Sequence, residues 1–132
     1  MSARREIANR LYRCARGFDD NDLDLLIDCF TADAELVSFE GTTSGRDAIR
    51  DSLSARRAAS GADTQPRHML TNIEIDLESD GTATARASYV LLSAAQAGIA
   101  IVSTGVYVDR LVEEDETWRI SRMHVQVDRP GA

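Results

Sequence analysis

The chain has 132 residues, of which 43% are hydrophobic and 28% charged, an ordinary balance for one globular domain with its own core. Its formal net charge is −7, so nucleic acid and anionic membranes would repel it and neither is an expected partner. The N-terminal stretch is charged and helix-forming, so we expect no signal peptide and a cytoplasmic location. No repeat or linker interrupts residues 1–132, which we interpret as one domain.

The first half of the chain predicts helices. Apolar residues at Ile7 and Leu11 recur four apart, as on one face of a helix that Gly17 ends. A second helix, capped by Asn21 or Asp22, is expected to run through Phe30. A short strand at residues 34–40 follows, and then a third helix, capped by Ser44, over residues 46–57.

The second half of the chain predicts β-structure, because alternating apolar segments are separated by turn sequences such as ESDGT and AAQAG. The expected strands are residues 68–77, 82–93, 98–112 and 117–128. Ala87 to Val108 contains no charged residue and nearly reaches the length of a membrane span, but its serines, glycines and β-branched residues indicate two buried strands instead. Helices followed by an antiparallel meander indicate an α+β fold, whose curved sheet would enclose an apolar cavity.

Acidic residues crowd into the sequence FDDNDLDLLIDCF near the junction of the first two helices. Asp22 and Asp24 fit the first turn of the second helix, where carboxylates accept hydrogen bonds from free N–H groups. Asp28 is expected to face solvent. Asp19 precedes the cap and is free to turn inward, with Asp20 as the alternative. Carboxylates that are only one to three residues apart at the start of a helix cannot easily point at one cation, so we expect no metal site.

Two histidines, His68 and His124, are the candidate general bases. Strict alternation places His68 with Leu70 and Asn72 on the wetter face of its strand, so a role in a pocket requires either a bend in that strand or a cavity that lies over this face. The same alternation places His124 on the face of Trp118. Two cysteines lie among helix-forming residues and are expected to be buried and reduced, and neither pairs with a histidine at zinc-finger spacing.

If Asp19 and His68 meet in an apolar pocket, the carboxylate fixes the tautomer of the imidazole and stabilises the imidazolium. The second ring nitrogen is then free to accept a proton. No nucleophile motif such as G-x-S-x-G is present, so proton-transfer chemistry is favoured: elimination, isomerisation or aldol-type cyclisation. The residues considered for supporting or substrate-binding roles are Tyr12, Phe18, Phe30, Tyr89, Arg110 and His124.

An ordered set of short motifs covers nearly the whole chain, from Ile7 to about Val127. The set comprises the acidic run from Asp19 to Asp33–Ala34, GRDAI at 45–49, Arg67–His68, YVDRL at 107–111 and WRI at 118–120. Together they resemble the SnoaL-like branch of the nuclear transport factor 2-like superfamily. The resemblance implies a cone-shaped α+β barrel, in which a curved antiparallel sheet wraps around three N-terminal helices and leaves a pocket at its wide end.

The resemblance also implies a chemistry. In dehydrochlorinase-type relatives an Asp and a His form the proton-abstracting pair, and Asp19 and His68 occupy the matching positions. Two departures are evident: Tyr12 lies seven residues before Asp19, where dehydratase relatives place their tyrosine five before, and Ser38 stands near the position of the base of steroid isomerases. Epoxide hydrolase relatives need an arginine and two aspartates in an arrangement that is not found.

The leading hypothesis is a small lyase or isomerase that needs no cofactor and acts on an apolar, aromatic or polycyclic molecule. His68 would remove a carbon-bound proton, Asp19 would orient it, and His124 could donate to the leaving group. Two alternatives stay open: a non-catalytic small-molecule-binding or subunit-type member of the same fold, and a polyketide-cyclase-like aldol cyclisation. The family and the exposed sheet suggest a homodimer or a higher homo-oligomer.

Overall fold

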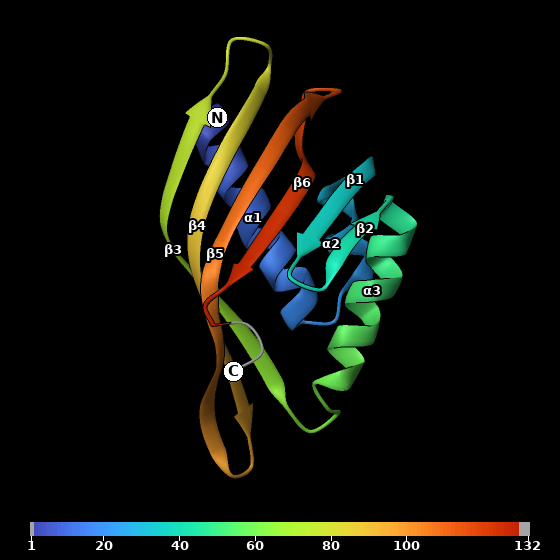
Figure 1. The fold of residues 1–132 in the computed structure, drawn as a ribbon, viewed down its shortest axis with the longest axis vertical. Coiled ribbons are helices and arrows are strands. Elements are labelled where there is room, and N and C mark those ends of the chain that lie inside the picture. The colour runs from blue at the N-terminus through green and yellow to red at the C-terminus, as the bar shows by residue number, and fades with distance from the viewer. Residues whose placement is uncertain (1, 130–132) are drawn as a thin grey trace.

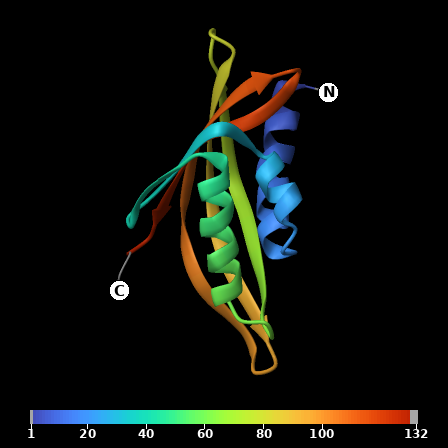
Figure 2. The ribbon, with the colours of Figure 1, turned by 90° about the vertical axis from the view of Figure 1, so that its right-hand side faces the viewer.

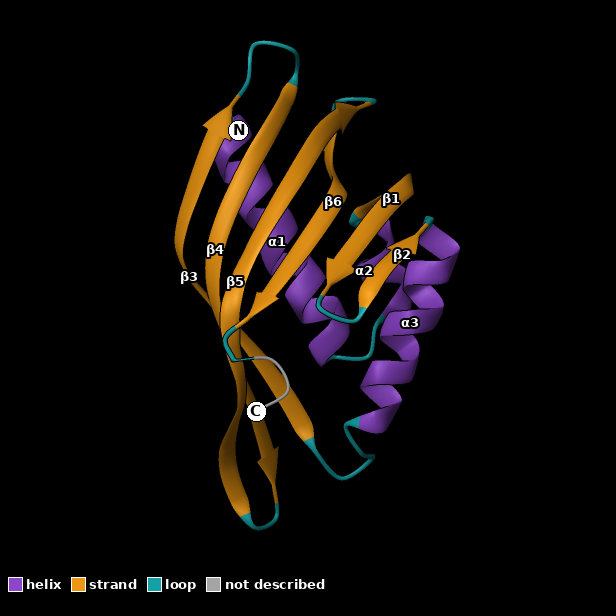
Figure 3. Cartoon of the chain, viewed as in Figure 1, coloured by secondary structure: helices purple, strands orange, loops and turns teal. Residues whose placement is uncertain are grey.

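The computed structural model describes residues 2–129, which form three helices and six strands (Figures 1 and 3). The helices are α1 (Ala3–Asp19), α2 (Leu23–Asp28) and α3 (Arg46–Ala59). The strands are β1 (Phe30–Ser38), β2 (Gly41–Ser44), β3 (Gln65–Leu77), β4 (Thr82–Ala95), β5 (Gly98–Glu114) and β6 (Thr117–Val127). The predicted α+β class and the four long strands of the second half are confirmed.

The strands form one sheet in the order β2-β1-β6-β5-β4-β3. Every neighbouring pair is antiparallel except β1 and β6, which are parallel. The sheet is strongly curved, but β2 and β3 remain as its two edges, so it does not close on itself (Figure 1). Helix α1 lies across one face of the sheet and α3 packs beside β1 and β2 (Figure 2).

The junction between α1 and α2 is built by one cap and one glycine. The side chain of Asp22 accepts a hydrogen bond from the backbone N–H of Leu25 at 3.1 Å, which confirms the predicted cap. A Cβ atom added to Gly17 would lie 2.8 Å from the backbone nitrogen of Leu26. Only a glycine therefore lets the two helices approach this closely, and the tight turn fixes the position of Asp19.

The edge of the sheet that β1 and β2 form differs from the sequence prediction. Helix α2 ends at Asp28, and Phe30 already belongs to β1 instead of ending the helix. Strand β2 was not expected. Ser44 is not the cap of α3, because its backbone pairs with Glu35 in the sheet. Gly45 takes that place with a φ of 91°, a conformation that favours glycine.

A β-bulge divides β3 into two halves. The register with β4 shifts between Thr71 and Glu74, and Asn72 has a positive φ of 52°. One extra residue exchanges the two faces of a strand, so inward-facing positions fall on even numbers before the bulge and on odd numbers after it. The side chains that face the core or the pocket are therefore His68, Leu70, Ile73 and Ile75. Both conditions that could give His68 a role in a pocket are met, because the strand is irregular at Asn72 and a cavity lies over the face of His68 and Leu70.

A second bulge, in β6, corrects the prediction for His124. Arg110 of β5 pairs with Arg122 and Leu111 pairs with Ile120, so Ser121 is an extra residue in β6. The inward-facing residues of β6 are Trp118, Ile120, Met123 and Val125. His124 therefore lies on the face opposite to Trp118, and alternation failed because it assumed an unbroken strand.

The core lies between α1 and the sheet. Ile7, Phe30 and Ile120 are fully buried there, and Cys14 and Cys29 are buried free thiols, as predicted. Each fully buried isoleucine or phenylalanine side chain stabilises the fold by about 1.5 to 3 kcal/mol relative to an exposed one. Within residues 2–129 there is no helix with both the length and the apolar character needed to span a membrane.

Candidate active site

The side chains of Asp19 and His68 meet between α1 and β3. The Oδ1 atom of Asp19 lies 2.6 Å from Nδ1 of His68, and its Oδ2 accepts a hydrogen bond from the backbone N–H of His68 at 2.8 Å. The two side chains are only 6% and 11% exposed, respectively. Because both carboxylate oxygens contact the same residue, the carboxylate fixes the position of the imidazole as well as its tautomer.

Two neighbouring side chains hold the end of α1 that carries Asp19. Arg57 of α3 donates hydrogen bonds to the carbonyl oxygens of Phe18 and Asp19, at 3.0 and 3.3 Å. Gln65 of β3 donates a third, to the carbonyl oxygen of Asp19, at 2.8 Å. Asp20, the alternative candidate, is exposed and pairs with Arg67 at 3.2 Å, so the structure places Asp19 and not Asp20 beside the histidine.

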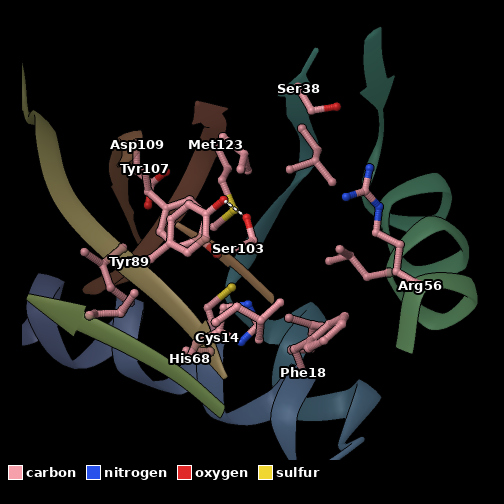
Figure 4. A pocket seen from close by; sticks show the side chains of 18 of the residues that line it. Cys14, Phe18, Ser38, Arg56, His68, Tyr89, Ser103, Tyr107, Asp109 and Met123 are labelled. Atoms are coloured by element: carbon pink, nitrogen blue, oxygen red, sulfur yellow. Dashed lines mark hydrogen bonds between the residues drawn. The ribbon is translucent and has the colours of Figure 1, made fainter. Parts of the chain in front are cut away.

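His68 faces a cavity of about 280 Å³ between the helices and the sheet (Figure 4). Its walls are mostly apolar, including Phe18, Leu70 and Val125, and a ligand inside would be shielded from water. Arg56 of α3 also lines the cavity and has an exposed side chain. Among the described residues, no hydrogen-bond partner contacts the Nε2 atom of His68, which leaves that nitrogen available to a ligand.

Aromatic rings shape the cavity beside the histidine. Phe18 packs edge-on against the His68 ring, with ring centroids 5.3 Å apart. The rings of Tyr89 and Tyr107 are stacked at 4.6 Å, and the hydroxyl of Tyr89 is 3.0 Å from Oγ of Ser103. Burial is the main cause that raises the pKa of Tyr107, so its phenol stays protonated. Flat, apolar walls of this kind suit a cyclic or aromatic molecule.

Asp109 of β5 is a pocket residue that the sequence prediction missed. It lines the cavity, it is only 1% exposed, and burial raises its pKa well above the ordinary value for an aspartate. The sequence carried a usable signal, because Asp109 alternates with Tyr107 and Leu111 on one face of a strand. An acid in register with inward-facing apolar residues is a candidate for burial.

Three other predicted positions lie outside the cavity. Tyr12 is on the outer side of α1 with 46% of its surface exposed, because it is one residue past the buried face that includes Leu11. Phe30 is fully buried in the core and lines no part of the cavity. Arg110 is exposed, with Nη2 3.3 Å from Oγ1 of Thr82, since it follows the inward-facing Asp109 and must point outward. The structure thus corrects the expectation that these side chains contact a ligand.

His124 is also outside the cavity, as a consequence of the β6 bulge. Its Nδ1 atom lies 3.4 Å from Nε2 of Gln126, and it does not line the pocket. Phe18 and Tyr89 are the supporting residues that the structure does bring to His68. Across the described part of the chain, no three His, Cys, Asp or Glu side chains gather in a way that could hold a metal ion.

Comparison with known proteins identifies the family. The model of the SnoaL-like domain matches residues 1–124. A search of curated proteins finds no match. Among solved structures, a variant of Rv3472 from Mycobacterium tuberculosis, a protein of unknown function, is 27% identical with a TM-score of 0.83, over 96% of this chain and 72% of that one.

Two proteins from Novosphingobium aromaticivorans show the same fold. One, an NTF2-like protein with a cystatin-like fold, is 23% identical with a TM-score of 0.87, over 98% of this chain and 84% of that one. The other, named as a candidate scytalone dehydratase, is 22% identical with a TM-score of 0.81, over 94% of this chain and 83% of that one. Together with the family match over most of its length, the fold and the pocket show that the chain belongs to the SnoaL-like family.

Proposed function

We propose that this protein is a lyase of the dehydratase type, which removes a carbon-bound proton from a cyclic or aromatic molecule with the Asp19–His68 pair. The observation that carries this proposal is the 2.6 Å contact between Oδ1 of Asp19 and Nδ1 of His68 at the wall of an apolar cavity. Histidine is the most frequent general base in enzymes, and a carboxylate that holds its ring orients it for that role.

The proton transfer follows from the geometry. Asp19 accepts the hydrogen bond from Nδ1–H, so Nε2 of His68 carries the free lone pair and faces the ligand. Nε2 takes the proton from carbon, and the electrons of that C–H bond form a double bond as the leaving group departs from the neighbouring carbon. The carboxylate stabilises the resulting imidazolium, which then returns the proton to a departing hydroxide to give water. This sequence of steps requires no cofactor and does not involve His124.

The surroundings of the pair support the same chemistry. Charges interact more strongly where water is excluded, and neither side chain of the pair is more than 11% exposed. The cavity of about 280 Å³ has room for a small ring system. The dehydratase named among the structural neighbours supports elimination as the reaction to test first, in preference to aldol cyclisation.

The test uses deuterium incorporation, because the natural substrate is not needed to detect proton abstraction. The full chain is incubated in D₂O with a panel of cyclic β-hydroxy ketones, aryl ketones and alicyclic halides, and exchange or elimination is followed by NMR and mass spectrometry. We expect His68→Ala to lower the rate about 1,000-fold and Asp19→Asn about 100-fold. Asp20→Asn is the matched control and should keep the wild-type rate.

The alternatives give different results. A protein that only binds its ligand would retain panel compounds without exchange, and both substitutions would leave that binding unchanged. A cyclase would give a new carbon–carbon bond and a product of unchanged mass. Exchange at the wild-type rate in His68→Ala would refute the proposal.

A further inference from the structure

Two cysteines, Cys14 and Cys29, lie at or beside the cavity and take no part in the pairing of Asp19 and His68. Cys14 belongs to α1 and lines the same cavity as His68 (Figure 4). Cys29 follows the last residue of α2, is fully buried, and is not among the described residues that line the cavity. Both are free thiols. One thiol is therefore open to a molecule in the cavity, and the other is not.

The two thiols are held next to each other. The Sγ atom of Cys29 lies 3.8 Å from the carbonyl oxygen of Arg10. In an α-helix the carbonyl of residue 10 is the acceptor for the backbone N–H of residue 14, so Cys29 contacts α1 at the turn that carries Cys14. The thiol of Cys14 donates a hydrogen bond to the sulfur of Cys29. A disulfide bond between them therefore requires only that two neighbouring sulfur atoms approach further.

Arg10 makes Cys29 the more acidic of the two thiols. The Nη1 atom of Arg10 lies 3.8 Å from Sγ of Cys29, at a buried position where charges interact strongly. The hydrogen bond from Cys14, together with the hydrogen bond and positive charge of Arg10, lowers the pKa of Cys29. The hydrogen bond to Cys29, together with burial, raises the pKa of Cys14. The pair thus contains its own base, because the thiolate of Cys29 can accept the proton of Cys14.

We propose that Cys14 and Cys29 form a redox-active dithiol, which a neutral hydroperoxide in the cavity oxidises to an intramolecular disulfide. The mostly apolar walls around Cys14 favour an oxidant that is neutral and apolar. The protein has a formal net charge of −7, so an anionic oxidant would be repelled from it. The reaction is independent of the proposed lyase chemistry, since it uses neither Asp19 nor His68.

The oxidation takes place in two displacements. The thiolate of Cys29 accepts the S–H proton of Cys14 while the sulfur of Cys14 attacks the terminal oxygen of the hydroperoxide. The O–O bond breaks, the alkoxide takes a proton from solvent and leaves as the alcohol, and Cys14 becomes a sulfenic acid. The sulfur of Cys29 then attacks that of Cys14, the S–O bond breaks, and hydroxide leaves as water with the proton of Cys29. Two thiols lose two electrons in total, and the hydroperoxide is reduced to alcohol and water.

The test compares two hydroperoxides of different polarity, cumene hydroperoxide and hydrogen peroxide, on the reduced full chain. Mass spectrometry should show that the intact chain loses the mass of two hydrogen atoms, and peptide mapping should show Cys14 linked to Cys29. The ratio of the cumene hydroperoxide rate to the hydrogen peroxide rate should be about tenfold higher for the native chain than for the chain in urea, because only the folded cavity binds the apolar reagent. Dithiothreitol should restore both thiols.

Two serine variants separate the roles of the thiols. Cys14→Ser removes the thiol that the cavity exposes, so we expect the remaining thiol to be lost at least about tenfold more slowly. Cys29→Ser removes the internal base, so oxidation should slow about tenfold and stop at a sulfenic acid that dimedone traps. Ala15→Ser is the matched control, since it places a hydroxyl on the same wall, and it should keep the wild-type rate and product.

The wild type alone decides the proposal if a serine variant does not fold. An equal rate ratio in the native chain and in urea would show that oxidation follows unfolding instead of entry into the cavity, and would overturn the proposal. A disulfide between two chains would also overturn it. So would a sulfinic acid at Cys14 with Cys29 still reduced, because the two thiols would then not react with each other.

Discussion

Two buried aspartates lie at or beside the cavity, and they differ in their partners: Asp109 lines the cavity, whereas Asp19 lies behind the lining residue His68. Asp19 is 4% exposed and both of its oxygens contact His68, whereas Asp109 is 1% exposed and its Oδ1 has no hydrogen-bond partner among the described residues. The same type of side chain is therefore a hydrogen-bond acceptor at position 19 and lacks a partner for one oxygen at position 109. One acid is paired with a base within the protein, and the other has a buried oxygen without a hydrogen-bond partner in the described part of the chain.

The difference shows that burial alone does not define the role of an acid. Burial without a partner favours the neutral form, which can donate a hydrogen bond, as the raised pKa of Asp109 indicates. Two N–H groups directed at a carboxylate hold it in place as an acceptor. Pockets that combine both kinds of acid can accept a proton at one end and stabilise an oxygen at the other.

The largest effect expected from this contrast is in the variant Asp109→Asn, whose free energy of unfolding should depend on pH differently from that of the wild type. Because the native pKa of Asp109 is raised, the unfolded chain releases this proton at about pH 4 while the native state keeps it, so the wild type loses stability as pH rises. Asparagine does not titrate. The free energy of unfolding of the variant relative to wild type should therefore rise as the pH increases from about 4 toward the raised native pKa, with a limiting slope of about 1.4 kcal/mol per pH unit.

Urea unfolding of both proteins at about pH 4.5, 5.5 and 6.5 measures this difference. A constant difference over the range would mean that Asp109 titrates as an ordinary carboxyl group. The comparison between the two aspartates would then fail.

The next effect concerns the other aspartate and has the opposite sign. Asp19→Ala removes the acceptor from both the ring and the backbone N–H of His68, and unsatisfied groups at a buried site are destabilising. We expect a loss of about 2 to 3 kcal/mol in the free energy of unfolding. Asp20→Ala is the control, since an exposed ion pair contributes about 0 to 1 kcal/mol. Equal losses in the two variants would contradict the assignment of Asp19.

The smallest effect tests the support of Asp19. Arg57→Ala removes the hydrogen bonds to the end of α1 and should destabilise the protein by about 1 kcal/mol. It should also slow proton exchange about tenfold, because the carboxylate is then held less firmly. Arg50→Ala, at an exposed position of the same helix, should change neither quantity. An unchanged exchange rate in Arg57→Ala would show that Gln65 alone holds the junction.

Much of the fold could be predicted from sequence because it depends on local patterns. Helix caps, turn sequences and alternating apolar residues place the long elements within a few residues of their observed ends. The short strand β2 escaped prediction because its residues, GTTS, bury almost nothing and pair only at the sheet edge. Its existence depends on a partner strand, not on its own composition.

The candidate site was harder to predict because it depends on the faces of strands. The approach of Asp19 to His68 was anticipated from the helix junction and the family resemblance, and the β3 bulge removes the conflict with alternation. The β6 bulge had the reverse effect and turned His124 outward. Asp109 was overlooked, although its alternation with the apolar Tyr107 and Leu111 placed it on the inward face of its strand. A bulge leaves little trace in sequence, yet it decides which residues share a cavity.

The bulge at Asn72 has a further consequence, for how this pocket can change. It separates β3 into a segment that forms the cavity wall, with His68 and Leu70, and a segment that packs on the core, with Ile73 and Ile75. Substitutions in the first segment can alter which molecules fit while the second keeps the architecture intact. Losing a single residue between the segments would rotate one of them outward, so at this point the protein tolerates exchange of side chains far better than changes of length.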